Sequence, residues 1–479
     1  MDFVIRPFVQ TRAERGLRGV VRVPSDKSIG HRAVILAAIA EGTSTLRRFS
    51  FGEDNVATLR AFEAMGVAHE LQDAPEGAQA PKGGTVAIHG VGLFGLQQPR
   101  DATPLDCGNS GTTMRLLSGL LCAQPFGTSL IGDASLSRRP MRRVLSLLRE
   151  RGALCKGRSI RVEKNGVARE DETAPIVIAP LLEGEELREL STSLTIASAQ
   201  VKSALLLSGL YAHGPTVVQE PTLSRDHTER MLMRAGVPLQ AMGAVVRLDP
   251  SGWDGRIEPF DLAIPGDLSA AAFLVVAANV IAGSQVRIVD VGCNPTRTGA
   301  LDVLRAMGGG AQVVPKGERG GEPVATLDTG AAVNDSGDGM NATTIGGELV
   351  PRAIDEVPVL CVAAAFAKGR TVVRDAAELR VKESDRLATM ADVLRAFGLD
   401  ARELPDGLEI EGKPRGALRA SEVDSKGDHR IAMSAALLAL RADGESRVRD
   451  VECVATSFPG FARVLRDLGA DVREEPSQQ

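Results

Sequence analysis

Hydrophobic and polar positions follow one order six times along this chain. Each block has a polar loop, an apolar segment rich in Ala and Leu, a short strand-like run, and an amphipathic segment that ends at a glycine. A helix that is apolar on all sides must be buried, whereas an amphipathic helix lies at a surface. The pattern therefore predicts six buried helices, at 33–40, 114–122, 201–210, 270–281, 357–366 and 431–440.

Strands and surface helices complete each block. The predicted strands lie at 43–49, 128–131, 215–219, 285–290, 370–375 and 447–452. The amphipathic helices end at Gly66, Gly152, Gly236, Gly308, Gly398 and Gly469, and glycine commonly ends a helix. These glycines stand 71 to 90 residues apart, which is longer than the roughly 20–50 residues of a solenoid repeat. The spacing suits a βαβαββ module that is used six times.

Six modules predict an α/β protein with two domains of three modules each, helices inside and sheets outside. The length of 479 residues agrees with two or more domains. We expect an N-terminal domain at 22–264 and a C-terminal domain from 1–21 plus 265–479, with 1–21 adding an extra strand to the second. Hydrophilic stretches at 73–84, 156–173 and 316–345 predict surface hairpins or loops.

Composition and charge narrow the function. Aromatic residues make up 3% and the net charge is -5, which argues against a nucleic-acid-binding protein. The six cysteines form no C-x-x-C pair, so they predict neither a zinc site nor a disulfide framework and fit a cytoplasmic protein. No secretory apolar core and no apolar run long enough to favour a membrane span are seen.

The loop at 23–32, with the sequence VPSDKSIGHR, gathers charge where the first buried helix should begin. Lys27 and Arg32 add two positive charges and Ser28 adds a hydroxyl, while Ser25 or Ser28 is expected to cap the helix. A helix start also has unpaired N–H groups and a partial positive charge. The loop therefore suits a phosphate or carboxylate, although an exposed basic turn is an equally good interpretation.

Polar groups open the next two buried helices as well. Residues 106–115, DCGNSGTTMR, contain Gly111, which has no Cβ and so lets a ligand approach the backbone. Arg139 comes directly before a proline and could clamp an anion. In the third block Ser and Gln of the run SAQVK at 198–202 could bond hydroxyls or phosphate oxygens, and Arg225 follows. For Asp226 and Thr228 the better interpretation is helix capping.

The last blocks place carboxylates among cations. Asp355 opens the fifth helix, either as a reactive carboxylate or as a cap, and RVKESDR at 380–386 holds Lys382, Glu383 and Arg386. Arg430 opens the sixth helix. A net acidic protein that gathers cations at helix starts is expected to bind small, multiply anionic substrates. Carboxylates among those cations stay ionised and could shuttle protons.

These motifs closely resemble the 5-enolpyruvylshikimate-3-phosphate (EPSP) synthase family over residues 12–472. The resemblance rests on DKS at 26–28 with Arg32, NSGT at 109–112, RP at 139–140, SAQ at 198–200, RVKESDR at 380–386 and DHR at 428–430. The runs at 198–202, 225–229 and 294–297 are similar to the class II branch of that family.

The resemblance implies a fold, a reaction and partners. The family fold is a pair of inside-out α/β, barrel-like domains of three βαβαββ units each, which close on substrate in the cleft between them. The family transfers the enolpyruvyl group of phosphoenolpyruvate to the 5-hydroxyl of shikimate 3-phosphate and releases phosphate, a step of the shikimate pathway of aromatic amino acid biosynthesis. It needs no redox cofactor and no catalytic metal. We expect a monomer that binds these two small molecules and neither nucleic acid nor membrane.

Site residues follow from the same resemblance. Asp355 and Glu383 are implied as proton-transfer groups, with Lys382 and Lys27 beside them. Shikimate 3-phosphate is implied to contact Lys27, Ser28, Arg32, Ser198, Ala199, Gln200, Arg225, Asp355 and Lys382. Phosphoenolpyruvate is implied to contact Lys27, Gly111, Arg139, Gln200, Arg386 and Arg430.

Two positions depart from the class I pattern, and a third differs from tolerant class II enzymes. Thr456 stands where class I enzymes carry a lysine near phosphoenolpyruvate, and Ser224 stands where they carry a tyrosine, with Arg225 as its substitute. Glyphosate competes with phosphoenolpyruvate in this family, and tolerant class II enzymes carry Ala at the place of Gly111. We therefore expect this protein to be more sensitive to glyphosate than its class II motifs suggest.

Two other functions compete with this interpretation. The sister enzyme that transfers enolpyruvyl to UDP-N-acetylglucosamine shares the fold but relies on a loop cysteine, and no cysteine stands in a comparable loop here. A non-catalytic anion-binding module would need the cations but not the pair Asp355 and Glu383.

Overall fold

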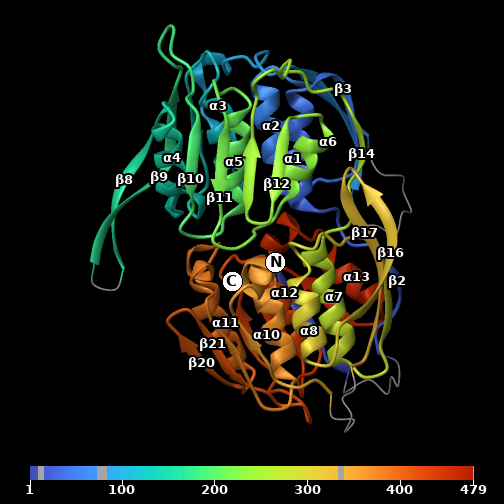
Figure 1. Cartoon of the computed structure of the whole chain (residues 1–479). Helices are drawn as coiled ribbons and strands as arrows, with labels where there is room; N and C mark the ends of the chain where they lie inside the picture. The colour runs from blue at the N-terminus through green and yellow to red at the C-terminus, as the bar shows by residue number, and fades with distance from the viewer. Residues whose placement is uncertain (9–15, 73–82, 165–166, 333–338, 478–479) are drawn as a thin grey trace.

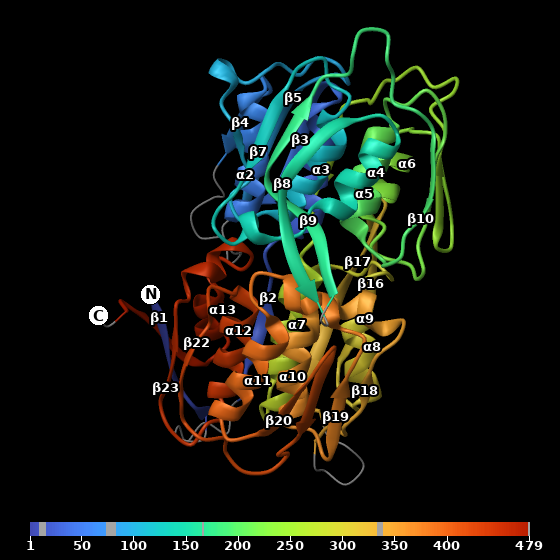
Figure 2. The same cartoon turned by 90° about the vertical axis from the view of Figure 1, so that its left-hand side faces the viewer.

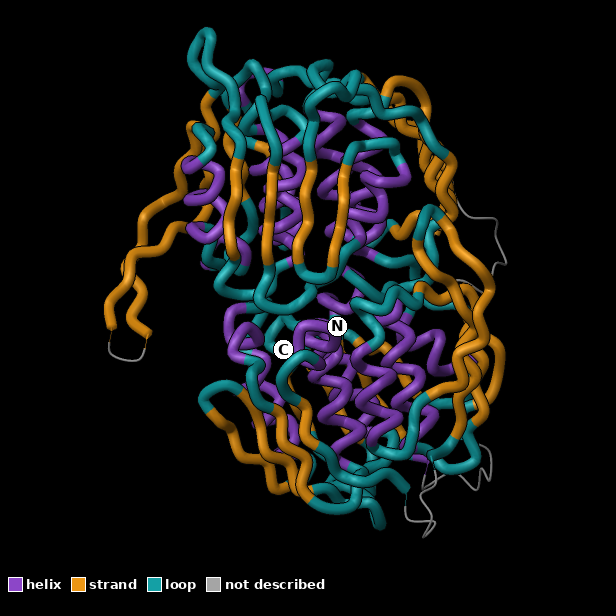
Figure 3. Tube along the Cα trace, in the orientation of Figure 1, coloured by secondary structure: helices purple, strands orange, loops and turns teal. Residues whose placement is uncertain are grey.

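The computed structural model of the chain describes residues 1–8, 16–72, 83–164, 167–332 and 339–477. Figure 1 shows two units stacked one above the other, each with helices in the middle and strands around them, and Figure 3 shows the same layering by colour. The expected inside-out α/β fold is confirmed. The described residues form six four-stranded sheets, three in each unit.

The N-terminal unit consists of three sheets around three buried helices. Its sheet orders are β14-β3-β5-β4, β6-β7-β9-β8 and β10-β11-β13-β12. Its elements are α1 (Lys27–Ala38), β3 (Glu41–Ser50), α2 (Glu53–Ala64), β4 (Ala68–Gln72), β5 (Gly83–Val91), β6 (Leu105–Asp106), α3 (Gly111–Leu121), β7 (Thr128–Ile131), α4 (Arg142–Glu150), β8 (Leu154–Lys164), β9 (Val167–Ala179), β10 (Leu190–Ser193), α5 (Ala199–Gly209), β11 (Thr216–Gln219), α6 (His227–Arg234), β12 (Leu239–Met242), β13 (Val245–Leu248) and β14 (Asp261–Ala263).

The C-terminal unit repeats this plan. Its sheet orders are β2-β15-β17-β16, β18-β19-β21-β20 and β22-β23-β1-β24. Its elements are β1 (Asp2–Arg6), β2 (Arg18–Val21), α7 (Leu268–Val280), β15 (Gln285–Gly292), α8 (Gly299–Ala306), β16 (Ala311–Arg319), β17 (Glu322–Gly330), β18 (Thr344–Ile345), α9 (Leu349–Ala353), α10 (Val357–Ala365), β19 (Arg370–Val373), α11 (Arg386–Ala396), β20 (Asp400–Leu404), β21 (Gly407–Glu411), β22 (Glu422–Asp424), α12 (His429–Ala439), β23 (Ser446–Arg449), α13 (Phe461–Asp467) and β24 (Asp471–Glu475).

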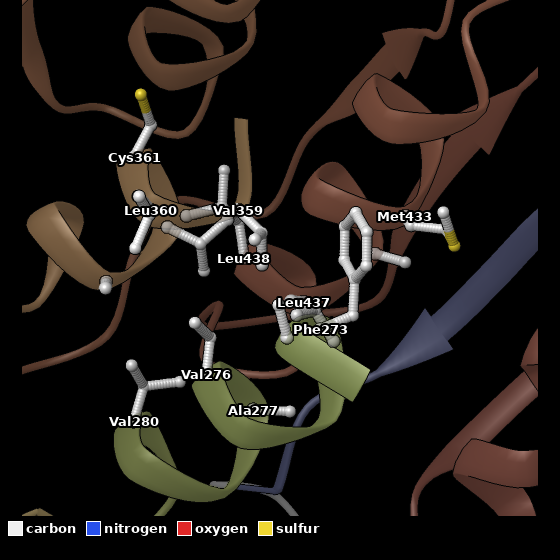
Figure 4. Packing of buried hydrophobic residues seen from close by; sticks show 14 of the residues in the cluster. Phe273, Val276, Ala277, Val280, Val359, Leu360, Cys361, Met433, Leu437 and Leu438 are labelled. Carbon is white, nitrogen blue, oxygen red and sulfur yellow. The ribbon is translucent and has the colours of Figure 1, made fainter. Parts of the chain in front are cut away.

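All six apolar segments form buried helices, as predicted: α1, α3 and α5 in one unit and α7, α10 and α12 in the other. Their all-round apolar surfaces allow them to pack against one another at the centre. Figure 4 shows this packing in the C-terminal unit, where Phe273 and Val276 of α7 lie near Val359 of α10 and Leu437 and Leu438 of α12. This arrangement holds the starts of the buried helices in fixed positions.

The six predicted C-terminal glycines also appear. Gly66, Gly152, Gly236, Gly308, Gly398 and Gly469 each follow an amphipathic helix and have φ between +79° and +106°. Glycine adopts this left-handed conformation without the steric conflict that a Cβ would create, which explains the shared ending.

Two modules differ from the predicted plan. β14 pairs in parallel with β3, and β2 pairs in parallel with β15, so the first strand of each unit's first module comes from another part of the chain. The strand-like run before the first helix therefore belongs to the C-terminal unit. β1 pairs with β23 and β24, so both strands of the first 21 residues join that unit, as expected. The exact domain bounds at 21 and 264 stay a prediction.

The predicted surface loops are more regular than expected. Residues 156–173 lie mostly in β8 and β9, which form a long hairpin that projects from the N-terminal unit in Figure 1. Figure 2 shows the same hairpin from the side. Residues 316–330 continue the β16–β17 hairpin, and 83–84 begin β5. Residues 73–82 and 333–338 lie outside the described residues.

Candidate active site

A cavity of about 120 Å³ lies between the two units, at the starts of the buried helices. Helices α1 and α3 begin at the predicted residues Lys27 and Gly111, and α11 begins at Arg386. The predicted residues that line the cavity are Lys27, Ser28, Arg32, Gly111, Arg139, Ala199, Gln200, Arg225, Asp355, Lys382, Glu383, Arg386 and Arg430. Ser198 does not line it but caps α5 through the N–H of Val201, at 3.5 Å.

The caps of these helices are partly different from those predicted. Asp26, rather than Ser25 or Ser28, caps α1 by accepting from the N–H of Ile29 at 3.0 Å. Asp226 and Thr228 were expected to cap α6, but Asp226 makes no side-chain cap bond. The hydroxyl of Thr228 instead accepts from Nε of Arg32 at 2.6 Å, so it orients a predicted substrate residue. The expectation of capping at these two residues was wrong.

Asp355 lies at the centre of the cations. Its carboxylate is 2.6 Å from Nη2 of Arg225, 3.5 Å from Nζ of Lys382 and 3.4 Å from Nη1 of Arg386. Burial opposes ionisation of Asp355, but Lys382, Arg225 and the other cations outweigh it and hold its pKa well below the ordinary value. The carboxylate is therefore ionised, and its hydrogen-bond partners are the side chains of Arg225 and Arg386 rather than a backbone N–H of the helix start.

Glu383 faces the same cations from the other side. Its carboxylate is 2.5 Å from Nη2 of Arg386 and 3.7 Å from Nη1 of Arg139. Burial raises its pKa, but the charges of Arg386 and Arg139 outweigh burial and hold the pKa well below its ordinary value.

Lys382 has an unusual environment. The charge of Asp355 favours its ammonium form, but burial and the charge of Arg386 outweigh this and lower the pKa of Lys382. A lysine of this kind exchanges a proton with its neighbours more readily than an exposed one does.

Arg115 is a cavity residue that sequence reasoning did not select. Its Nη1 donates to Oε1 of Gln200 at 2.6 Å and to the carbonyl of Gly111 at 3.4 Å, and its Nη2 donates to the carbonyl of Pro140 at 3.0 Å. It thus connects three predicted substrate segments. The only hint in the sequence was a charged residue inside an otherwise apolar helix.

Arg297 was also not selected, although its motif was noted. Its guanidinium donates to the carboxylates of Asp26 at 2.5 Å and Asp267 at 3.0 Å and to the hydroxyl of Ser269 at 2.6 Å. Asp26 precedes α1 and Asp267 precedes α7, so Arg297 connects the two chain segments that cross between the units.

His429 lines the cavity too, and burial lowers its pKa to about 3, which keeps its ring neutral.

Thr456 and Ser224, the two positions that depart from the class I pattern, do not line the cavity. The hydroxyl of Thr456 donates to the carbonyl of Cys453 at 2.7 Å. Ser224 is buried, and its N–H donates to the carboxylate of Glu220 at 3.2 Å. Arg225, by contrast, reaches the cavity, in agreement with its expected role as a substitute.

The lining carries more positive than negative charge. It contains ten Lys and Arg side chains against five carboxylates, an excess of five positive charges in a chain whose net charge is -5. A wider groove of about 1000 Å³ lies on the N-terminal unit beside α2 and 97–106, but only Arg60 and Arg100 among its lining residues are cations. The concentration of charge therefore favours the smaller cavity as the site for anions.

Two other features are absent from the described residues. In that part of the chain no helix has the length and apolar character needed to cross a membrane. The same residues contain no group of three or more His, Cys, Asp or Glu side chains arranged to hold a metal ion.

Comparisons with known proteins identify the family of this chain. The family model of EPSP synthase (3-phosphoshikimate 1-carboxyvinyltransferase) matches residues 11–465. A 3-phosphoshikimate 1-carboxyvinyltransferase of Geobacter metallireducens is 49% identical, covering 96% of this chain and 98% of its own. The one of Geobacter sulfurreducens is 50% identical, covering 94% of this chain and 96% of its own.

Solved structures show the same fold. The EPSP synthase of Acinetobacter baumannii is 39% identical, with a TM-score of 0.80 and coverage of 99% of this chain and 100% of that one. The enolpyruvyl transferase NikO of Streptomyces tendae is 18% identical, with a TM-score of 0.68 over 98% of each chain, a likeness of fold alone. The family match over nearly the whole length, the relatives at half identity and the cationic cleft together show that this chain belongs to the EPSP synthase family.

Proposed function

We propose that the protein transfers the enolpyruvyl group of phosphoenolpyruvate to the 5-hydroxyl of shikimate 3-phosphate and releases phosphate. Family membership supports the reaction, and one observation of this chain carries it: an excess of five positive charges surrounds two ionised carboxylates, Asp355 and Glu383. Each substrate carries a carboxylate and a phosphate, so the pair would balance the excess charge.

The contacts of the cavity support a division of roles. Shikimate 3-phosphate would lie against Lys27, Ser28, Arg32, Arg225 and Lys382, with 198–200 beside it. Phosphoenolpyruvate would lie against Gly111, Arg139, Arg386 and Arg430, with Lys27 and Gln200 between the two substrates.

The reaction needs two proton transfers in the addition of the hydroxyl and two in the elimination of phosphate. Asp355, ionised at neutral pH, would take the proton of the 5-hydroxyl while the hydroxyl oxygen bonds to C2 of phosphoenolpyruvate. Glu383 would deliver a proton to C3. An anionic substrate beside Glu383 would raise its pKa and so let it carry that proton. Glu383 would then take a proton from C3 of the tetrahedral intermediate as the C2=C3 double bond forms and the C2–O bond to phosphate breaks, and the proton held by Asp355 would leave with the phosphate. Arg139 and Arg386 would hold the charge of the leaving phosphate.

The rival interpretations lack support at this cavity. Of the six cysteines, all of which the structure describes, none lines it, whereas the sister enzyme relies on a loop cysteine. A mere anion-binding module would not need two carboxylates held ionised among the cations.

One assay separates the three functions. The protein is mixed with phosphoenolpyruvate and either shikimate 3-phosphate or UDP-N-acetylglucosamine, and phosphate release is measured. We expect release with shikimate 3-phosphate alone. Release only with the nucleotide sugar would identify the sister activity, and binding of both anions without any release would identify a binding module.

The finer expectations on partners and location are part of this proposal. A monomer is the expected state, and light scattering on the purified protein would test it. The six free cysteines fit a reducing compartment, which supports a cytoplasmic location, and cell fractionation would test that.

A further inference from the structure

A buried cluster of three charged side chains lies behind the proposed shikimate 3-phosphate site. Nζ of Lys202 is 2.6 Å from Oε2 of Glu220 and 2.7 Å from Oε1 of Glu229, and each of the three side chains is at most 3% exposed. Lys202 belongs to α5, Glu229 belongs to α6, and Glu220 follows β11. None of them lines the cavity, so they cannot act on a substrate directly.

Glu220 reaches both loops that supply substrate residues. Its Oε1 accepts the N–H of Ser198 at 3.0 Å, and its Oε2 accepts the N–H of Ser224 at 3.2 Å. Ser198 directly precedes Ala199 and Gln200, while Ser224 directly precedes Arg225. A single carboxylate therefore sets the relative position of two backbone segments that approach the cavity.

Lys202 is the cation that pairs with Glu220, and it is shared with Glu229. A buried carboxylate is stable as an ion only beside a cation, and the removal of one partner of a buried pair leaves an uncompensated charge. Burial raises the pKa of Glu229, which Lys202 opposes. Glu220 thus pairs with Lys202 through Oε2 while its two oxygens accept both backbone N–H groups.

We propose that Glu220 is a positioning residue for shikimate 3-phosphate, which acts through the backbone N–H groups of Ser198 and Ser224 and is held in place by Lys202. This inference rests on the proposed function, because only that function assigns 198–200 and Arg225 to this substrate. A shift of either loop would misplace substrate contacts, and catalysis is sensitive to misplacements of about 1 Å.

Glu220→Gln tests the proposal with little risk to folding. An amide of the same shape keeps one acceptor oxygen but turns an NH₂ group toward the second N–H donor or toward Lys202, and the remaining pair of Lys202 and Glu229 is charge-balanced. We expect the KM for shikimate 3-phosphate to rise about tenfold, the effect of losing a hydrogen bond to a charged group. The KM for phosphoenolpyruvate should rise less, within about threefold, because Gln200 is the residue of these two segments that is also assigned to that substrate.

Arg151→Met provides a matched control at the other end of α5. Arg151 is also fully buried, and it donates to the carbonyl of Leu205 at 3.1 Å and to the hydroxyls of Ser208 at 2.6 Å and Thr216 at 2.8 Å. Its loss should lower the free energy of unfolding, measured in urea, and leave both KM values near those of the wild type.

The outcomes distinguish a failure of this inference from a failure of the proposed function. An unchanged KM for shikimate 3-phosphate in Glu220→Gln, with a wild type that turns over normally, overturns this inference alone and makes the cluster purely structural. Equal rises of both KM values overturn it as well. A wild type that releases no phosphate with the two substrates overturns the proposed function and this inference together.

Discussion

At the scale of single residues, Asp355 shows how charge alone can distinguish a reactive group from a helix cap. Its sequence position fits both interpretations, but the carboxylate contacts Arg225, Lys382 and Arg386 and no backbone N–H of α10. These contacts favour the reactive group.

Replacement of Asp355 should therefore affect turnover more than binding. We expect Asp355→Ala to lower kcat by roughly 10²–10⁴-fold, the range for loss of a general base, with a much smaller change in the dissociation constant of shikimate 3-phosphate. The control is Asp385→Ala, since Asp385 caps α11 through the N–H of Ala388 at 3.1 Å. Loss of that cap should cost about 0.5–2 kcal/mol of stability and leave kcat nearly unchanged. Near-normal turnover in Asp355→Ala would show that the residue has only a structural role.

Gly111 is the residue at which the structure sharpens the expectation about glyphosate. A Cβ at this position would lie 2.8 Å from Nη1 of Arg115 and 3.3 Å from Nη1 of Arg139. Arg115 is buried and held by Gln200 and Pro140, so the methyl group of Gly111→Ala would press on the arginines that surround the proposed phosphoenolpyruvate site.

We expect Gly111→Ala to raise the inhibition constant of glyphosate by a larger factor than the KM for phosphoenolpyruvate. Glyphosate is the longer molecule, and added volume in a packed site costs ~1–3 kcal/mol. Both constants are measured on the wild type, on Gly111→Ala and on Gly127→Ala. A Cβ at Gly127, before β7, meets only ordinary contacts at 3.5 Å, so that variant should change neither constant. Equal changes of the two constants in Gly111→Ala would contradict the prediction.

The environment of Lys382 predicts how kcat/KM for shikimate 3-phosphate falls at high pH. Its pKa is lowered from the ordinary 10.5, so on raising the pH it loses its proton, and its attraction for an anionic substrate, earlier than an exposed lysine would. The kcat/KM for shikimate 3-phosphate, which reports the free enzyme, should therefore fall with a midpoint below 10.5. Lys382→Arg, whose guanidinium stays charged, should move this fall to higher pH. An identical basic limb in the two proteins would exclude Lys382 as its cause.

At the scale of elements, the repeated helix endings have a measurable consequence for stability. Gly236 ends α6 with φ +79°, and a Cβ there would meet nothing within 4 Å. Any effect of a substitution at this position therefore comes from the backbone conformation rather than from a clash.

We expect Gly236→Ala to lower the free energy of unfolding by about 1 kcal/mol, the strain of a left-handed residue with a Cβ. Gly236→Asn should lower it less, because Asn adopts this conformation more readily. Urea unfolding measures both, with Gly127→Ala as a glycine whose φ is not in the left-handed range. Equal losses for Ala and Asn would mean that another factor sets the stability at this helix end.

At the scale of the whole molecule, ion pairs between the two units hold the cleft closed. Arg143 makes two bonds of 3.1 Å to Glu378, and Arg225 pairs with Asp355. The cavity of about 120 Å³ is smaller than the roughly 300–1,000 Å³ of typical ligand sites, so the units must separate to admit two substrates. The excess positive charge of the lining also opposes closure when no anion is bound.

Shikimate 3-phosphate should therefore draw the units together. We expect small-angle scattering to give a smaller radius of gyration with saturating shikimate 3-phosphate than without it. Shikimate, which lacks the phosphate, should have a weaker effect at the same concentration because it neutralises less of the charge. A radius that does not change with shikimate 3-phosphate would count against closure of the cleft on substrate.

The sequence by itself determined the features that depend on neighbouring residues. The six buried helices, their glycine endings and the polar loops before them follow from local periodicity and capping, and all six helices appear within a few residues of their predicted ranges. The loops also gave seven of the ten cationic residues that line the cavity, because a helix start is a favourable place for an anion wherever it occurs.

Only the tertiary structure decided which of these distant segments meet. Arg225 and Asp355 are 130 residues apart in the chain, and Arg297 and Asp26 are 271 apart. The exchange of β2 and β14 between modules and the pairing of Thr228 with Arg32 are likewise set by the packing of whole units. No local pattern records such partners, because the free energy of a buried ion pair or of a strand pairing depends on groups that come together only when the chain has folded.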